Sequence, residues 1–380
     1  MYNLQKDDYR RKFVYQLLFF LITTIVGIWA TTYSPLADLL TPPDEKESMH
    51  AAKNTITELV ESRILDRDVA TRLTSHELRM AARIVDPKML SNGFEDIGGL
   101  EETKRKIFAN ILVPLKNHKQ FLGDDPMYPR PVRGVLFAGP SGTGKTMTAR
   151  SIAKEAGVKF INVTLSDIND KWHGESERLM SAVFSLAAKI APCIIFIDEI
   201  DGLIGERNAM DQTHVYALKT HFLSLMDGLN DRATPVMVIG CTNNAAHIDK
   251  AMRRRLPLVI SFQLPTPEER FAILCKIMRN DTVEERQIIA KAAILSDGFS
   301  GSDLDNMYRE ACMHRMAQIM EGTRTDRRLL QADVDAGLEA TARSMDAHRV
   351  NHLKINTSTE GRSVTAEKLL ASLFAAAPPS

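Results

Sequence analysis

A glycine-rich segment of the chain carries a lysine and a threonine at a spacing suited to binding phosphate. It reads Gly139-Pro-Ser-Gly-Thr-Gly-Lys-Thr146. Glycines let successive backbone N–H groups converge on phosphate oxygens at the start of a helix, lysine adds positive charge, and the threonine hydroxyl can bind magnesium. An apolar run at Gly134–Ala138 precedes the segment and a helical pattern at Met147–Ala156 follows it, which is the expected strand, loop and helix order. We predict that this loop binds a nucleotide through Pro140, Ser141, Gly142, Thr143, Gly144, Lys145 and Thr146.

A second motif supplies carboxylates about fifty residues later. An apolar run from Ile194 to Ile197 is typical of a buried strand, and it ends in Asp198 and Glu199. In a parallel sheet, such a strand end lies beside the phosphate loop. We expect Asp198 and Thr146 to bind magnesium, and Glu199 to polarise the attacking water, a division of labour that phosphoryl transfer to water requires. The two motifs together predict an enzyme that hydrolyses ATP with Mg²⁺.

One N-terminal segment has the composition of a membrane span. Residues 13–33 are uncharged and mostly apolar, and at about 1.5 Å per residue they cover roughly 30 Å of hydrocarbon. Tyr15, Trp29 and Tyr33 lie toward its two ends, where aromatic rings favour the headgroup layer. We expect one transmembrane helix. A signal peptide is the less favoured alternative, because the apolar stretch exceeds the usual length and no clear cleavage site follows.

Charge and ATP supply indicate opposite orientations of this span. Basic residues are more numerous before it than shortly after it, so the positive-inside rule would place the N-terminus in the cytosol. The nucleotide-binding segment follows the span, however, and needs a compartment rich in ATP. We therefore expect the ATPase part to face the cytosol.

Composition excludes several classes of function. The 48 basic and 48 acidic residues cancel, so no overall field favours nucleic acid, and we expect no nucleic-acid partner. Four cysteines lie tens of residues apart, without the close pairs of a zinc site or the density of a disulfide scaffold, at Cys193, Cys241, Cys275 and Cys312. A reducing compartment fits this pattern.

Several segments resemble, in sequence and in order, those of the classical AAA ATPases. Besides the two motifs above they are Phe94-Glu-Asp-Ile-Gly-Gly-Leu100, Asp227-Gly-Leu229, Cys241-Thr-Asn243 and Gly298-Phe-Ser-Gly-Ser-Asp-Leu304, and together they cover about residues 90–320. With its apolar N-terminal segment and short linker, the chain looks like the AAA translocases of the mitochondrial outer membrane, which extract mislocalised tail-anchored proteins. The resemblance implies an α/β fold, an AAA+ P-loop ATPase with a parallel sheet core and a small helical lid domain, preceded by one transmembrane helix.

The same resemblance implies roles for further residues. Asn243 matches the asparagine that helps to position the lytic water. Arg254 and Arg255 fall where the family supplies arginine fingers to the ATP of a neighbouring subunit. For Arg253 we favour a solvated position instead. Lid and base contacts are implied for Gly301, Ser302, Asp96, Ile97 and Gly98. In the segment after the second strand, Trp172 and His173 match a pore loop that grips substrate polypeptide.

The expected organisation follows from these assignments. It comprises a short N-terminal segment (1–12), a transmembrane helix (13–33), a helical linker (34–90), a large ATPase subdomain (91–265), a helical lid (266–345) and a C-terminal tail (346–380). In the linker, Thr74 and Glu77 have the spacing of a capping box and predict a helix start.

The resemblance implies a homo-hexamer that hydrolyses ATP and threads tail-anchored or other membrane proteins through its pore, in the mitochondrial outer membrane or the peroxisomal membrane. Two alternatives stay open. One is a microtubule-severing AAA ATPase, although no long basic region separates the apolar segment from the ATPase motifs. The other is a scaffold or switch in which ATP changes partner affinity without translocation.

Overall fold

The computed structural model describes residues 57–61, 65–90, 93–121, 131–168, 174–203, 209–230, 234–278, 283–326 and 328–345. The predicted transmembrane helix at 13–33 and the predicted pore-loop residues Trp172 and His173 lie outside these ranges. Within them, no helix has the length and apolar content needed to cross a bilayer.

A six-stranded sheet forms the centre of the larger subdomain, in the order β1-β3-β4-β5-β2-β6. Its parallel strands are β2 (Gly134–Ala138), β3 (Lys159–Thr164), β4 (Cys193–Asp198), β5 (Val236–Thr242) and β6 (Leu258–Ser261). β2 has the bounds predicted from the sequence. Because β2 lies between β5 and β6, and β5 pairs with β4, the loops that follow these strands meet at one edge of the sheet.

The expected parallel sheet core is present in β2 to β6, but the sheet as a whole is mixed because of one edge strand. β1 (Ile84–Val85) pairs antiparallel with β3, with Ile84 opposite Ile161. β1 belongs to the segment expected to be a helical linker, and it reaches the edge before the first strand–helix–strand unit begins. A strand that needs no crossover helix is free to run antiparallel.

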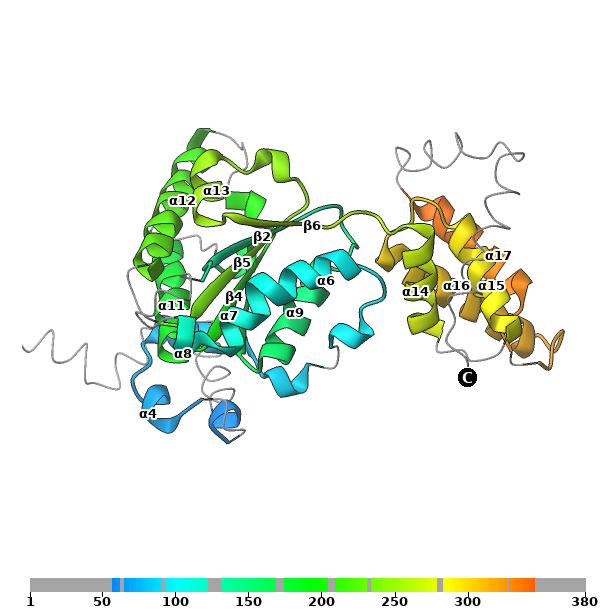
Figure 1. Cartoon of the computed structure of the whole chain (residues 1–380), viewed down its shortest axis with the longest axis horizontal. Helices are drawn as coiled ribbons and strands as arrows, with labels where there is room; N and C mark the ends of the chain where they lie inside the picture. The colour runs from blue at the N-terminus through cyan, green and yellow to red at the C-terminus, as the bar shows by residue number, and fades with distance from the viewer. Residues whose placement is uncertain are drawn as a thin grey trace, which may run out of the picture.

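Helices cover both faces of the sheet (Figure 1). On one face lie α5 (Ser75–Ala81), α11 (Glu175–Lys189), α12 (Ala209–Asn230) and α13 (Lys250–Arg255); on the other lie α6 (Glu101–Ile107), the π-helical turn Phe108–Leu112, α7 (Val113–Lys116) and α9 (Lys145–Ala156). Successive β4 residues alternate between the two cores, with Ile195 on the first face and Phe196 on the second. Because both faces are buried, β4 reads as a continuous apolar run.

Short elements connect these layers. They are α4 (Arg67–Ala70), α8 (His118–Phe121), α10 (Leu165–Ile168) and the 3₁₀ turns Pro87–Met89, Phe94–Asp96, Ile200–Leu203 and Ala245–His247. The capping box predicted in the linker is confirmed at the start of α5, where the Thr74 N–H donates to Glu77 at 2.7 Å and the Glu77 N–H donates to Thr74 Oγ1 at 3.3 Å.

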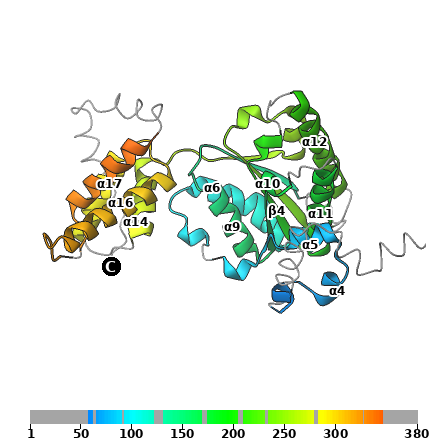
Figure 2. The same ribbon diagram turned by 180° about the vertical axis from the view of Figure 1, so that it is seen from behind.

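The lid is a separate bundle of helices beside the sheet subdomain, and Figure 2 shows it from behind. It contains α14 (Pro267–Met278), α15 (Val283–Leu295), α16 (Gly301–Met320) and α17 (Gln331–Ser344). Its own apolar core includes Leu274, Phe299, Leu304 and Val334. One extended segment, residues 262–266, joins β6 to α14, and we call this segment the hinge.

Candidate active site

The glycine-rich loop lies between β2 and α9, as the sequence predicts. Gly142 has φ 76° and Gly144 has φ 92°, values that side-chain-bearing residues rarely adopt. A Cβ on Gly142 would also lie 2.5 Å from Ser300 Oγ, so glycine is required there for space as well as for conformation. The first backbone N–H groups of α9 have no partners within the helix. The loop therefore presents N–H donors and the positive end of a helix dipole to an anion.

Lys145 places its amine inside this loop. Its side chain donates from Nζ to Gly139 O at 2.7 Å, to Pro140 O at 2.8 Å and to Asn243 Oδ1 at 2.9 Å. Lys145 is 7% exposed, and this burial lowers the pKa of its amine, while the nearby carboxylate of Asp198 works in the opposite direction. The predicted lysine and the predicted asparagine are thus in direct contact, although 98 residues separate them in the chain.

The carboxyl end of β4 supplies the acidic groups. Thr146 Oγ1 donates to Asp198 Oδ2 at 3.2 Å, so the two predicted magnesium ligands lie together. A hydroxyl and a carboxylate suit Mg²⁺, which takes few protein ligands and keeps waters or phosphate oxygens in its other positions. Glu199 follows with φ 53°, a strained conformation for a residue with a side chain, and its N–H donates to Asp198 Oδ1 at 3.0 Å. Such strain costs on the order of 1–3 kcal/mol and is concentrated at functional sites.

A cavity of about 590 Å³ opens over these groups. It is the size of a site for a cofactor-sized ligand. Its lining contains most of the predicted site residues, namely Asp96, Ile97, Gly98, Ser141, Gly142, Thr143, Gly144, Lys145, Thr146, Asp198, Glu199, Asn243, Gly301 and Ser302. Pro140 is not part of this lining, but its carbonyl oxygen accepts a hydrogen bond from Lys145 Nζ. We call residues 139–146 with Asp198, Glu199 and Asn243 the P-loop end of the cavity.

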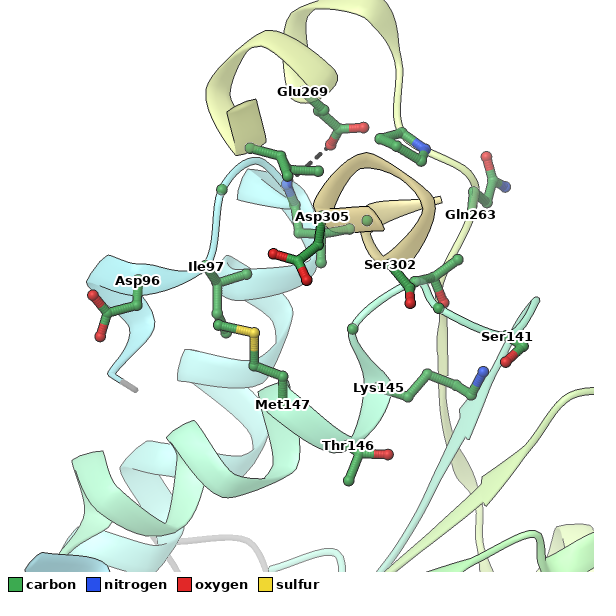
Figure 3. A pocket seen from close by; sticks show the side chains of 18 of the residues that line it. Asp96, Ile97, Ser141, Lys145, Thr146, Met147, Gln263, Glu269, Ser302 and Asp305 are labelled. Atoms are coloured by element: carbon green, nitrogen blue, oxygen red, sulfur yellow. Dashed lines mark hydrogen bonds between the residues drawn. The ribbon is translucent and has the colours of Figure 1, made fainter. Parts of the chain in front are cut away.

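The opposite part of the cavity is built by residues 96–100 and by one face of α14. Glu269, Ile273 and Ile277 line it, and we call this part the lid end. In Figure 3, Lys145 and Thr146 lie at one end of the view and Glu269 at the other. The sequence analysis missed the α14 residues. These residues are spaced four apart, which places them on one face of a helix and could have been recognised in the sequence. Nothing in the sequence, however, indicates that this face contacts a loop almost 170 residues earlier.

The three consecutive arginines of α13 lie in different environments. Arg255 donates to both oxygens of Asp227, at 3.0 and 2.7 Å, and these bonds lower the pKa of Asp227. Arg253 is exposed, in line with the solvated position predicted for it, and it also donates to Ile248 O at 3.0 Å and to Ala245 O at 2.9 Å in the turn before α13. Arg254 is exposed. Neither Arg254 nor Arg255 belongs to the described residues that line the cavity of this chain.

Comparisons with known proteins agree with this geometry. Residues 135–264 match the model of the ATPase family associated with various cellular activities (AAA). The human outer mitochondrial transmembrane helix translocase is 35% identical over 338 residues, which cover 87% of this chain and 92% of that protein. The translocase of the same name from Xenopus tropicalis is 38% identical over 297 residues, covering 78% and 81%.

A relative and a solved structure extend the comparison. A Caenorhabditis elegans protein named mitochondrial sorting homolog is 35% identical over 264 residues, covering 70% of this chain and 76% of its own. The crystal structure of the FIGL-1 AAA domain in complex with ADP superposes with a TM-score of 0.59 at 28% identity, covering 77% of this chain and 96% of that one.

Proposed function

This chain belongs to the AAA ATPase family, and from that premise we propose that it is a membrane-anchored translocase that uses ATP to extract proteins from a lipid bilayer. The relatives that match most of its length are named outer mitochondrial transmembrane helix translocases. The observation that carries the enzymatic part is the contact of Lys145, Asn243, Thr146 and Asp198 around one cavity.

The P-loop end would hold the phosphates. The backbone N–H groups at the start of α9 and the buried amine of Lys145 neutralise their charge, which matters more in a partly dry site than in water. Thr146 and Asp198 would hold Mg²⁺, which when bound offsets the charge that develops between the outer phosphates. The FIGL-1 domain, with the same fold, was crystallised with ADP, which supports a nucleotide in this cavity.

Glu199 would act as the base in hydrolysis. Glu199 follows the last residue of β4 with a strained backbone conformation, and it lines the same cavity as Asn243. The carboxylate would polarise a water for attack on the outer phosphate, and the Asn243 amide would orient that water. Because the Asn243 carbonyl oxygen already accepts from Lys145, its NH₂ group is left for this role.

The lid would transmit the state of the nucleotide. The Ser302 N–H donates to Gly142 O at 3.2 Å, so the first turn of α16 bonds directly to the phosphate loop. A change in that loop on hydrolysis would move the lid as a body, because the lid has its own core. In a homo-hexamer, Arg254 would reach the ATP of the neighbouring subunit, and Trp172 and His173 would grip the substrate in the central pore.

Residues 13–33 would anchor the chain by a single span in the mitochondrial outer membrane, or in the peroxisomal membrane, with the ATPase part facing the cytosol. The membrane proteins expected as substrates are tail-anchored proteins inserted in the wrong membrane. A basic or nucleic-acid-binding surface plays no part in this scheme, in line with the balanced charge of the chain.

Reconstitution tests this function. The full chain and a model tail-anchored protein are placed in liposomes, and ATP-dependent release of the model protein is measured. We expect release by the wild type, no release by Glu199→Gln, and ATP hydrolysis without release by Trp172→Ala. Full release by Glu199→Gln would instead support an ATP-dependent switch, and hydrolysis stimulated by tubulin would support a severing enzyme.

A further inference from the structure

Two adjacent side chains of α14 hold the backbone of the hinge. Pro265 C=O accepts from Arg270 Nη1 at 2.9 Å, and the Thr266 N–H donates to Glu269 Oε2 at 3.0 Å. Arg270 is 2% exposed, and its Nε donates to Ala293 O at 2.7 Å, near the end of α15. The hinge is therefore fixed to the lid by side chains that are themselves parts of the lid.

The second carboxylate oxygen of Glu269 leaves the lid. Glu269 Oε1 accepts from the Leu100 N–H at 3.0 Å, a bond between residues 169 positions apart (Figure 3). Leu100 has φ 60°, which is strained for a leucine, and it precedes α6 without a side-chain cap. Glu269 thus bonds both to the hinge and to a strained turn of the sheet subdomain, and it does so while lining the cavity.

The loop at 96–100 packs on α14 without free space. A Cβ on Gly98 would lie 2.6 Å from Ile273 Cα, and a Cβ on Gly99 would lie 2.9 Å from Glu269 Cβ. On its other side, the loop is held by Lys104, whose Nζ donates to Ile97 O at 2.7 Å. The loop is therefore attached to α6 and to the lid at the same time.

These contacts continue to the phosphate loop. Arg270 Nη1 lies 3.3 Å from Asp297 Oδ1, in the turn between α15 and α16. A few residues later, Ser300 caps α16 and the Ser302 N–H reaches Gly142 O. The two ends of the cavity are thus connected through the lid, and Glu269 is the side chain at which the loop at 96–100 joins that connection.

We propose that Glu269 is a positioning residue that makes the loop at 96–100 and the lid hinge move as one unit. The position of this loop, which forms part of the lid end of the cavity, would then follow the orientation of the lid. The inference rests on the proposed nucleotide site. It concerns ligands that carry a base and ribose, because a ligand made of phosphate alone would need only the P-loop end.

The test compares two ligands on the full chain. The affinities of ADP and of inorganic tripolyphosphate are measured by competition against a fluorescent nucleotide, for the wild type, Glu269→Gln and Glu268→Gln. Glutamine keeps the size of the side chain but turns an NH₂ group toward one of the two backbone N–H donors, which removes one acceptor. Glu268 is the matched control, since it is the exposed neighbour on the same helix and loses the same charge.

For Glu269→Gln we expect the Kd of ADP to rise about five- to tenfold, within the net contribution of a typical intramolecular hydrogen bond, with the Kd of tripolyphosphate changed less than about twofold. Glu268→Gln should alter neither. Retained tripolyphosphate binding shows at once that the variant is folded. An equal loss for both ligands, or no loss for either, would overturn the proposal for Glu269. A wild type that binds neither ligand would instead refute the nucleotide site itself.

Discussion

The two ends of the cavity are built in different ways. At the P-loop end, most of the groups come from two short motifs, and each lies at the end of a parallel strand of one sheet. At the lid end, residues 96–100 meet α14 across almost 170 positions of sequence, and single side-chain bonds and glycine contacts hold them together. The sheet makes the first end rigid. The structure of the lid end depends on the position of the lid, so we expect substitutions at the lid end to change nucleotide affinity and not the rate of the hydrolysis step.

The largest effect on nucleotide affinity is expected from Lys145→Ala. The substitution removes a buried cation from the P-loop end and leaves phosphate charge without its partner, so the affinity for ADP and for tripolyphosphate should fall alike, roughly 10²–10³-fold. Fluorescence competition measures both. Lys154→Ala, in the last turn of the same helix, is the control and should bind both ligands normally. A loss confined to ADP would contradict the assignment of Lys145 to the phosphates.

Arg254→Ala should lower turnover about 10³-fold while leaving ADP affinity nearly unchanged, because an arginine finger acts on the transition state at the site of another subunit. Steady-state hydrolysis with a parallel binding measurement checks this. Arg253→Ala is the control, since Arg253 bonds within its own turn. In mixed rings, Arg254→Ala subunits should inhibit their neighbours. Normal turnover of Arg254→Ala would transfer the role to Arg255, which here bonds Asp227.

Gly98→Ala should affect the lid end alone. Its methyl group would lie 2.6 Å from the Ile273 backbone, which cannot rotate away, so the loop and α14 would separate. Overpacking of this kind costs about 1–3 kcal/mol, and we expect the Kd of ADP to rise about tenfold with tripolyphosphate binding retained. Gly93→Ala is the matched control, because a Cβ there would lie 3.4 Å from Glu155 Oε1, at ordinary contact distance. Equal binding of ADP by the two variants would remove the distinction between the ends.

The smallest effect on nucleotide affinity is expected from the interior of the lid. Asp333 is fully buried, with Arg324 Nη1 at 2.8 Å and His314 Nδ1 at 3.0 Å. Burial alone would raise the pKa of Asp333, but hydrogen bonds from Arg324, the Leu330 N–H and His314 lower it below the ordinary value. A lowered pKa in the folded state stabilises the lid above the unfolded pKa of about 3.9, and this contribution is lost as the pH falls through the folded pKa.

Denaturant unfolding followed by circular dichroism at several pH values checks this prediction. Asp333→Asn should lower the free energy of unfolding of the lid by about 3 kcal/mol at pH 7. Its stability should also depend less on acid than that of the wild type. At pH 7, its affinity for ADP should stay within about twofold as long as the lid is folded. The same acid dependence in both proteins would show that Asp333 does not carry the effect.

The difference between the P-loop end and the lid end also explains which features could be predicted from the sequence. β2 and the positions of Lys145 and Asp198 follow from local motifs whose chemistry fixes the residue type, whereas Asn243 was identified from the family resemblance and its contact with Lys145 was not predicted. β1 has two residues and no periodicity, so its antiparallel pairing could not be foreseen. The role of Glu269 was not predicted because its partners are backbone N–H groups. Almost every residue type has such a group, so the residue types at the partner positions do not indicate the contact.

The arginines show a related limit. Their position in the chain predicts a cluster at the end of α13, but only folding shows that Arg255 meets Asp227 while Arg254 stays exposed. The transmembrane helix at 13–33 and the pore-loop roles of Trp172 and His173 lie outside the described residues and stay predictions.

Nucleotide binding and turnover of Glu199→Gln beside the wild type decide whether this cavity hydrolyses ATP as described. Both proteins should bind ATP with Mg²⁺ at similar affinity, because Lys145, Thr146 and Asp198 are unchanged. Turnover of the variant should fall at least about 10²-fold, the contribution of a general base. Hydrolysis at the wild-type rate would contradict the role of Glu199, and the absence of nucleotide binding by the wild type would contradict the site as a whole.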